Sequence, residues 1–302
     1  MEPDSSGAAD GATPWRISLD YSYNNANQLI QDTTRRKSRE SYPASDGGTN
    51  GLGVRNRYEK LVAGASYDYS EKLTIGVTLP FVRNERWEDH HHYSDYTSQG
   101  LGDITIYAKY WLRHEKDAFN GYIDLALGLP TGKSDGKFTY IPEKATEPTT
   151  KYKASYIQEG LGQWVPILGL GFEKNISSMT TLYGRAQYSD PQGTNNAGYK
   201  SQNNLLANLG AGYTFEPSGQ KVYGVTGQFN YIYAQFRKDQ RDGKDVDNTG
   251  GVWLDFQPGA FFSPNGGKLL FSISAPVNIY YDVNSIQTYA PWMVNVGVSS
   301  RF

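Results

Sequence analysis

The last stretch of the chain, Tyr289 to Phe302, reads YAPWMVNVGVSSRF and decides the fold. Every second residue from Trp292 to Phe302 is apolar, except at Ser300, and the residues between them are mostly small or polar. This period of two is that of a β-strand with one apolar face. Aromatic residues near both ends of such a strand are typical of a transmembrane barrel, where they lie at the two membrane surfaces. The alternative is the last strand of a soluble β-sandwich.

Composition excludes several classes of protein. The chain has 302 residues, 24 of them Tyr, and no Cys. No run approaches the roughly 18 apolar residues that a membrane-spanning helix needs, so a helical membrane protein is excluded. The lack of cysteine excludes a disulfide scaffold, a thiol nucleophile and thiolate metal sites. A net charge of −2 argues against nucleic acid as a partner.

The alternating pattern starts at Trp15 and recurs in twelve segments along the chain. Polar or Gly/Pro-rich connections separate these segments, and short and long connections alternate. The long ones are expected at 31–50, 88–100, 132–157, 190–203 and 238–247, with a sixth before the closing strand. The sequence therefore predicts an all-β fold, a transmembrane antiparallel up-and-down β-barrel of about twelve strands over residues 15–302. Residues 1–14 are expected to form a flexible leader.

The alternation of short and long connections also predicts a location. It is typical of bacterial outer-membrane barrels, which have periplasmic turns and long extracellular loops. Both termini fall on the short-turn side and are expected in the periplasm. Met1 to Thr13 has no apolar core of a signal peptide, which fits either a soluble cytoplasmic protein or a mature exported one. The barrel pattern favours the mature exported protein. The terminal Phe302 resembles the signal that the barrel assembly machinery recognises, which makes that machinery an expected partner, together with outer-membrane lipid and lipopolysaccharide.

The residues of opposite parity should face the lumen. Acids and bases are mixed there, whereas a channel that selects ions by charge normally carries a ring of one sign. The charged residues expected to set selectivity are Asp103, Lys109, Arg113, Asp124, Arg185, Asp255 and Arg301. Aromatic residues expected in the lumen are Tyr107, Trp111, Tyr183 and Trp253. These side chains predict a channel for passive diffusion or uptake of small solutes, including aromatic or partly hydrophobic compounds. Mutual pairing of the charges inside a crowded lumen is the alternative.

Two motifs lie one predicted hairpin apart. Gly100-Leu101-Gly102-Asp103 precedes the strand ITIYAKYWL, and Leu129-Pro130-Thr131-Gly132 ends the next strand. In this order they resemble the family described as the MetA pathway of phenol degradation, a family of outer-membrane transporters. The resemblance covers residues 100–132 and implies a channel for aromatic or other small hydrophobic compounds. A second copy of the first motif, Gly160-Leu161-Gly162, favours a structural role, since glycine permits a bend or a close approach of two backbones.

Three other features give weaker hypotheses. His90-His91-His92 lies in a predicted loop and lacks the fixed geometry of a metal site, so we expect neither a metal nor a cofactor. The Arg35 to Arg39 cluster could contact lipopolysaccharide phosphates or could simply be solvated. An outer-membrane hydrolase would need a His beside a Ser nucleophile, and no histidine occurs within a predicted strand, so we expect no enzyme activity. A structural barrel that sheathes a partner protein is the main alternative to a channel.

Overall fold

The computed structural model describes residues 14–302, apart from 37–40, 44–48, 52–53, 89–95, 114, 116–118, 141–146, 202, 216–221, 235–237, 248 and 265–267. Within these residues nearly all of the regular structure is β-strand, and the one helix described is the short 3₁₀ turn η1 (Ser155–Ile157). Within the described residues, no helix has the length and hydropathy needed to cross a membrane.

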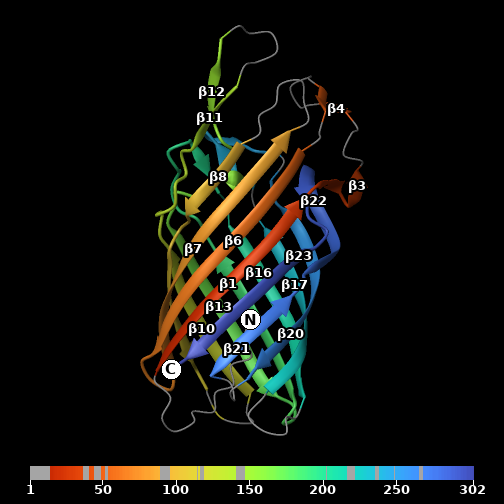
Figure 1. The fold of residues 1–302 in the computed structure, drawn as a ribbon. Helices are drawn as coiled ribbons and strands as arrows, with labels where there is room; N and C mark the ends of the chain where they lie inside the picture. Colours follow the sequence, from red (N-terminus) through yellow and green to blue (C-terminus); the bar gives the residue numbers. More distant parts are fainter. Residues whose placement is uncertain are drawn as a thin grey trace.

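The fold is a closed antiparallel β-barrel of twelve strands, which confirms the predicted fold class. Neighbours in sequence pair with each other all around the barrel, and the strands are inclined to its axis (Figure 1). Two of the twelve strands are interrupted and carry two labels each. In order around the barrel the strands are β1 (Trp15–Ala26), β6 (Val54–Asp68), β7 (Leu73–Glu88), β8 (Tyr96–Leu101) with β9 (Thr105–Trp111), β10 (Phe119–Gly128), β13 (Val165–Asn175), β14 (Thr180–Ser189), β16 (Asn204–Phe215), β17 (Val222–Ala234), β20 (Gly251–Ser263), β21 (Leu269–Ser274) with β22 (Val277–Tyr289), and β23 (Met293–Arg301).

The barrel closes where its first strand meets its last. β1 pairs with β6 on one side and with β23 on the other, in a register that runs from Arg16↔Arg301 to Asn24↔Met293. Beyond the end of β23, the Phe302 amide donates to the Trp15 carbonyl at 3.1 Å. No barrel strand is left with a free row of backbone groups at this seam, as a barrel in lipid requires. We call the end of the barrel that holds Trp15 and Phe302 the turn end, and the opposite end the loop end.

The closing strand begins earlier than its sequence predicts. β22 reverses direction at Asn284 and Ser285, where Ser285 has a φ of 56°. Its first half pairs with β20, and its second half pairs with β2 (Gln28–Asp32) in the register that β23 keeps with β1. The prediction of a long loop before the closing strand is therefore wrong, because a tight turn of two residues makes this connection.

Strands of the barrel wall extend into two other predicted loops. The segment predicted as a loop at 31–50 continues β1 through β2 into β3 (Thr34–Arg36), and β8 occupies the end of the predicted loop at 88–100. The remaining short strands all lie in the connections at the loop end. They are β4 (Ser41–Pro43), β5 (Thr49–Gly51), β11 (Lys137–Tyr140), β12 (Thr149–Tyr152), β15 (Tyr199–Lys200), β18 (Gln240–Arg241) and β19 (Lys244–Asp245).

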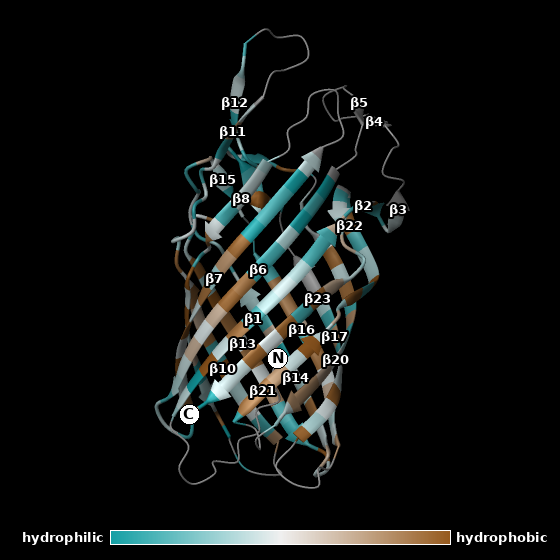
Figure 2. Cartoon of the chain, in the orientation of Figure 1, coloured by the Kyte–Doolittle hydropathy of each residue, from teal (hydrophilic) through white to brown (hydrophobic). Residues whose placement is uncertain are grey.

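An apolar belt surrounds the barrel, as the alternation predicts. Outward side chains such as Ile17, Leu125 and Leu170 are 51% to 57% exposed, and Figure 2 shows hydrophobic residues alternating along the strands over much of the wall. Exposed aromatic residues lie toward both ends of this belt, with Trp15 at the turn end and Trp164 at the loop end. So much exposed apolar surface is unfavourable in water and matches the hydrocarbon region of a bilayer.

Replacing Leu170 by Arg tests this belt. In a membrane the Leu170→Arg change should lower the free energy of unfolding by about 2–4 kcal/mol, because a charge would face hydrocarbon. The matched Thr97→Arg change places the same side chain on the outward face near the loop end of β8, opposite Glu85, and should cost less than about 1 kcal/mol. Urea-induced unfolding from lipid vesicles measures both values. Equal costs at the two positions would contradict a membrane belt.

Candidate functional site

The candidate site is the inner wall of the barrel, and Lys109 on β9 is its central cation. The Lys109 ammonium lies 4.9 Å from the ring centre of Trp111 and 4.4 Å from that of Tyr122 on the neighbouring strand β10. The two rings meet edge to face with centres 4.9 Å apart. Among the described residues, no carboxylate forms an ion pair with Lys109. Its charge is therefore stabilised by aromatic faces, a contact that holds the side chain close to the wall.

Other inward charges form ion pairs. Arg185 Nε on β14 lies 2.8 Å from Asp124 Oδ2 on β10, and the pair passes over Gly169 of the strand between them. Near the turn end, Arg301 donates to Asp68 Oδ2 at 2.9 Å, and Asp68 also accepts from the Thr74 hydroxyl. The structure thus brings Lys109, Asp124 and Arg185 together on one side of the barrel, while Arg301 lies at its turn end. Each of these ion pairs therefore joins two strands that are separated by one other strand.

Inward aromatic rings lie over glycines of the neighbouring strand. A Cβ added at Gly210 would lie 2.7 Å from the Tyr183 ring, and Tyr107 covers Gly76 in the same way. Tyr122 covers Gly171, and Phe261 covers Gly224. Because glycine has no side chain, each ring can pack against the wall instead of extending toward the barrel axis. These aromatic residues give the inner wall a ring-lined surface.

The opposite side of the inner wall is built from amides. Asn230 Nδ2 donates to Gln257 Oε1 at 2.8 Å, and Gln257 Nε2 donates to the Ser274 hydroxyl at 2.9 Å. Asp255 is buried and accepts from Asn278 Nδ2 at 2.7 Å. Trp253 lies on β20, as Asp255 does, and is half-buried. Its paired residues on the two adjacent strands are Ile232 of β17 and Tyr281 of β22. This side is polar, and its one carboxylate is hydrogen-bonded.

Two predicted lumen residues have other positions. Arg113 lies beyond the end of β9, in the turn to β10, where its side chain is 57% exposed and pairs with Glu115 at 2.7 Å. The prediction of a lumen position for Arg113 is therefore wrong, because the strand ends at Trp111. Asp103 lies in the interruption between β8 and β9. Its carboxylate accepts from the amides of Gly132 and Leu161, at 2.8 and 2.6 Å, so it joins loops instead of lining a strand.

The three glycine motifs of the sequence meet at Asp103. A Cβ on Gly132 would lie 2.8 Å from the Gly160 Cα and 2.9 Å from the Gly102 carbonyl carbon. Thr131 completes the contact, because its hydroxyl accepts from the Ile104 amide at 2.9 Å and donates to the Gly102 carbonyl. The motifs predicted one hairpin apart therefore form one close-packed junction, and their glycines permit this approach of three backbones.

The long connection after β10 folds into the barrel. Asn84 on the inner face of β7 donates to the carbonyls of Ile157 and Gln158, at 3.2 and 3.0 Å, and Ile157 is fully buried. The Gln158 amide both accepts from Gly136 N and donates to Gly136 O, at 3.0 and 3.1 Å. We call residues 153–161 the inner loop. Its contacts with inward residues place it inside the mouth at the loop end.

The inner loop also covers a strand edge. β8 pairs with β7 alone, since β10 pairs only with β9 on that side. Along the free edge of β8, Lys153 Nζ donates to the Thr97 carbonyl at 2.5 Å, and the Ala154 amide donates to the Tyr96 hydroxyl at 3.2 Å. Burial lowers the pKa of the Lys153 amine below its usual range. Irregular backbone therefore replaces a strand beside β8.

Neighbouring loops are tied across the mouth by polar contacts. Gln163 Nε2 donates to the Gly193 carbonyl, and Asn195 Nδ2 donates to the Leu161 carbonyl, at 2.5 and 3.1 Å. The Tyr199 hydroxyl donates to Asp239. Burial, and to a lesser degree the Asp239 carboxylate, raises the pKa of Tyr199, so the hydroxyl keeps its proton at neutral pH.

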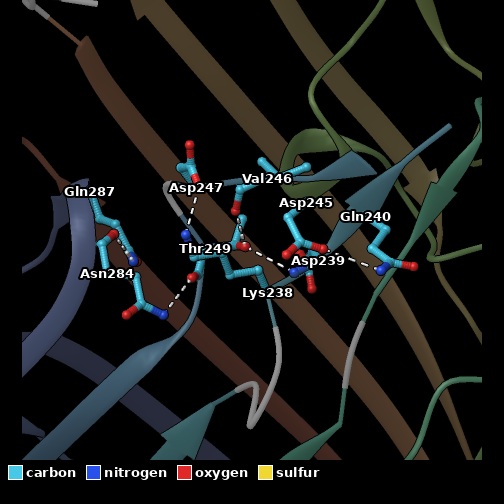
Figure 3. Close-up of polar contacts among 9 residues, drawn as sticks. All are labelled: Lys238, Asp239, Gln240, Asp245, Val246, Asp247, Thr249, Asn284 and Gln287. Atoms are coloured by element: carbon cyan, nitrogen blue, oxygen red, sulfur yellow. Dashed lines mark hydrogen bonds and ion pairs between the residues drawn. The ribbon is translucent and has the colours of Figure 1, made fainter. Parts of the chain in front are cut away.

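Figure 3 shows how this network continues to the closing turn. The Asp239 amide donates to the Thr249 hydroxyl at 3.0 Å, and Asn284 Nδ2 donates to the Thr249 carbonyl at 3.0 Å. Lys238 and Asp247 form an ion pair at 2.5 Å in the same loop. The connections after β10, β14 and β17 thus form one hydrogen-bonded cap at the loop end.

Some candidate residues were not singled out from the sequence. Tyr122 could have been found by parity, because Ile123 and Leu125 beside it face outward. Asn84, Gln158 and Asn195 carry no such signal, since they contact segments far away in the sequence. His90 to His92, His114 and the side chains of Arg35 to Arg39 lie outside the described residues. Within the part that is described, no group of His, Cys, Asp and Glu could hold a metal ion.

Comparisons with known proteins support the fold. No protein-family model matches the chain, and no curated protein has a similar sequence. The crystal structure of the COG4313 outer membrane channel from Pseudomonas putida F1 is similar, with a TM-score of 0.69, 13% identity and coverage of 100% of both chains. The β domain of the Bordetella autotransporter BrkA has a TM-score of 0.56 and 11% identity, covering 95% of this chain and 99% of its own. The first agrees with the resemblance to outer-membrane transporters. At these identities both establish the fold alone.

Adding one methyl group at Gly132 tests the junction of the three motifs. Gly132→Ala should lower stability by about 1–3 kcal/mol, because its Cβ has no space between Gly102 and Gly160. The matched change Gly121→Ala should be close to neutral, since the nearest atom, Gly171 O, is 3.9 Å away. The stabilities of the two variants are compared by thermal unfolding, which is monitored by the mobility of the folded and unfolded protein on a gel. A stable Gly132→Ala variant would contradict the close-packed junction.

Proposed function

We propose that the protein is a bacterial outer-membrane channel for passive uptake of small solutes, with aromatic and partly hydrophobic compounds as its substrate class. The observation that carries the proposal is the inner wall, where inward charges form ion pairs or contact aromatic rings, and other rings lie over glycines. Asp124 pairs with Arg185, Asp68 pairs with Arg301, and Lys109 rests on two rings. Such a wall offers no ring of one sign to select ions. It offers aromatic and amide surface to a small solute with little charge.

The membrane placement follows from the apolar belt and closed strand pairing. In the outer membrane, the cap would lie on the extracellular side and the short turns in the periplasm. The similarity to an outer membrane channel supports this choice. Trp15 and Phe302, the two ends of the barrel wall, lie close together at the turn end. This position agrees with a periplasmic location for both ends.

The inner loop acts as the gate in this proposal. It lies inside the mouth and is held by Asn84 and Gln158, so a solute must pass it or displace it. The same loop covers the free edge of β8. Movement of one segment would therefore widen the mouth and also uncover the one part of the wall that lacks a paired strand, which offers a hydrophobic solute a sideways path into lipid.

A barrel that sheathes a partner protein is the second candidate, because the β domain of an autotransporter has a similar fold. The inner loop and the cap argue against it, because a threaded polypeptide would have to displace both. An enzyme is disfavoured by the sequence, because none of the four histidines lies within a predicted strand, where it could be placed beside a Ser nucleophile.

Uptake of a fluorescent aromatic compound tests the proposal. Cells whose outer membrane contains the protein should take up N-phenylnaphthylamine several-fold faster than cells without it, because the lipopolysaccharide leaflet excludes this compound. The double change Asn84→Ala and Gln158→Ala releases the inner loop and should increase the rate further. Hydrolysis of a polar β-lactam in the periplasm reports general leakage and should rise much less.

The matched control removes an exposed hydrogen bond from the same connection. Thr139→Ala with Thr150→Ala abolishes the contact between their hydroxyls in the β11–β12 hairpin and should leave uptake at the wild-type rate. If the wild-type protein is present in the outer membrane and uptake equals that of cells without it, the channel proposal fails. A large rise in β-lactam hydrolysis alone would instead indicate a hydrophilic pore.

A further inference from the structure

A group of arginines lies on the outside of the barrel, at the loop end of β6 and β7. Counting outward positions toward the loop end, β6 presents Leu61, Glu59, Arg57 and Arg55, and β7 presents Phe81, Arg83, Glu85 and Trp87. Leu61 and Phe81 are exposed and belong to the apolar belt. The arginines therefore begin two residues beyond the belt, roughly 7 Å farther along the strand. Figure 2 shows hydrophilic residues on these upper halves of β6 and β7.

Glu85 holds two of these arginines side by side. Its carboxylate, 7% exposed, lies 2.8 Å from Arg57 and 2.6 Å from Arg83. A buried carboxylate between two guanidinium groups fixes both in place and lowers the entropy lost when they bind a further anion. We call Arg55, Arg57 and Arg83, together with Glu85 and Trp87, the outer arginine cluster.

Trp87 and Asn25 orient the guanidinium groups from the other side. The Trp87 ring centre lies 5.0 Å from Arg55 Cζ and 5.4 Å from Arg57 Cζ, so the indole contacts both. Arg55 Nε also donates to Asn25 Oδ1 at 3.0 Å. Stacked guanidinium groups keep N–H donors at their edges, and Arg83 is 48% exposed. With Glu59 and Glu85 counted, the three arginines leave one net positive charge.

The rest of the outer wall lacks such a feature. On the twelve barrel strands, as far as the structure describes them, outward arginines or lysines beyond the loop-end edge of the belt occur only on β6 and β7. At the same level of the outer wall, the other strands present exposed aromatic residues such as Trp164, Tyr188 and Tyr231. The cluster is therefore one site on one face, and a general positive charge around the barrel does not explain it.

We propose that the outer arginine cluster binds the phosphate groups of a lipopolysaccharide headgroup in the outer leaflet. The proposal rests on the placement in the outer membrane proposed above. Guanidinium groups match phosphate with paired N–H donors. The cluster faces away from the lumen at the level of the lipid headgroups, so the phosphates that lie against it belong to lipid. One bound glycolipid would thus be held beside the wall formed by β6, β7 and β8, next to the strand edge that the inner loop covers.

Binding of purified deep-rough lipopolysaccharide to the detergent-solubilised protein tests the site. The double change Arg55→Gln and Arg83→Gln removes the two more exposed cations and leaves the Arg57–Glu85 pair. Affinity should fall by about 10-fold. The control Lys137→Gln with Lys151→Gln removes the same charge from the β11–β12 hairpin and should leave affinity unchanged. Thermal unfolding without lipid establishes that each variant is folded.

Two further ligands separate the sources of phosphate. Dephosphorylated lipopolysaccharide should bind the wild-type protein as weakly as the intact glycolipid binds the double variant. Inorganic phosphate at the same phosphate concentration should not bind measurably. The proposal is overturned if the double variant keeps wild-type affinity, if the control loses as much, if dephosphorylation has no effect, or if inorganic phosphate binds as tightly. Uptake of N-phenylnaphthylamine by the double variant should stay normal, so a failed channel proposal and a failed lipid site give different results.

Discussion

The need to pair every backbone N–H and C=O group within the wall is the constraint on which the rest of this structure depends. In hydrocarbon an unpaired group costs several kcal/mol, so a sheet can cross a membrane only as a closed barrel. The register between β1 and β23 achieves this closure, and β22 bends back at Ser285 to extend the same pairing to β2. Closure then divides each strand into an outward apolar face and an inward polar face. The one departure, at β8, is covered by the inner loop.

The interior follows from the same division. An inward charge is partly removed from water, and it is stable where a nearby strand supplies an opposite charge or an aromatic face. Arg185 reaches Asp124 across a strand because Gly169 leaves space between them, and the Tyr183 ring can lie over Gly210 because Gly210 has no side chain. Glycines on the inner face thus decide how far each large side chain extends. Together with the inner loop they shape the wall that a solute would contact.

Much of the fold could be predicted from alternation alone, and the departures have identifiable causes. The period of two could be read directly for residues such as Ile17 and Leu170, because each strand turns one face outward and the other toward the interior. The turn at Asn284 and Ser285 was missed because it contains neither Gly nor Pro, the usual markers of a turn. Arg113 was assigned to the lumen because the alternation in the sequence continues past the end of β9, which gives Arg113 the parity of an inward residue. The inner loop was beyond prediction, since Asn84 and Ile157 are 73 residues apart and their contact has no periodic signature.

The central claim is that the inner face of this barrel lines a passage, and modification of a single cysteine tests it most directly. The chain has no cysteine of its own, so a charged thiol reagent would have one target in each variant. Gln187 faces inward and Ala186 beside it faces outward. In a planar bilayer, single-channel current through the Gln187→Cys variant should fall on modification, while current through the Ala186→Cys variant should not change. A silent bilayer containing inserted protein, or an equal response of the two variants, would contradict the account.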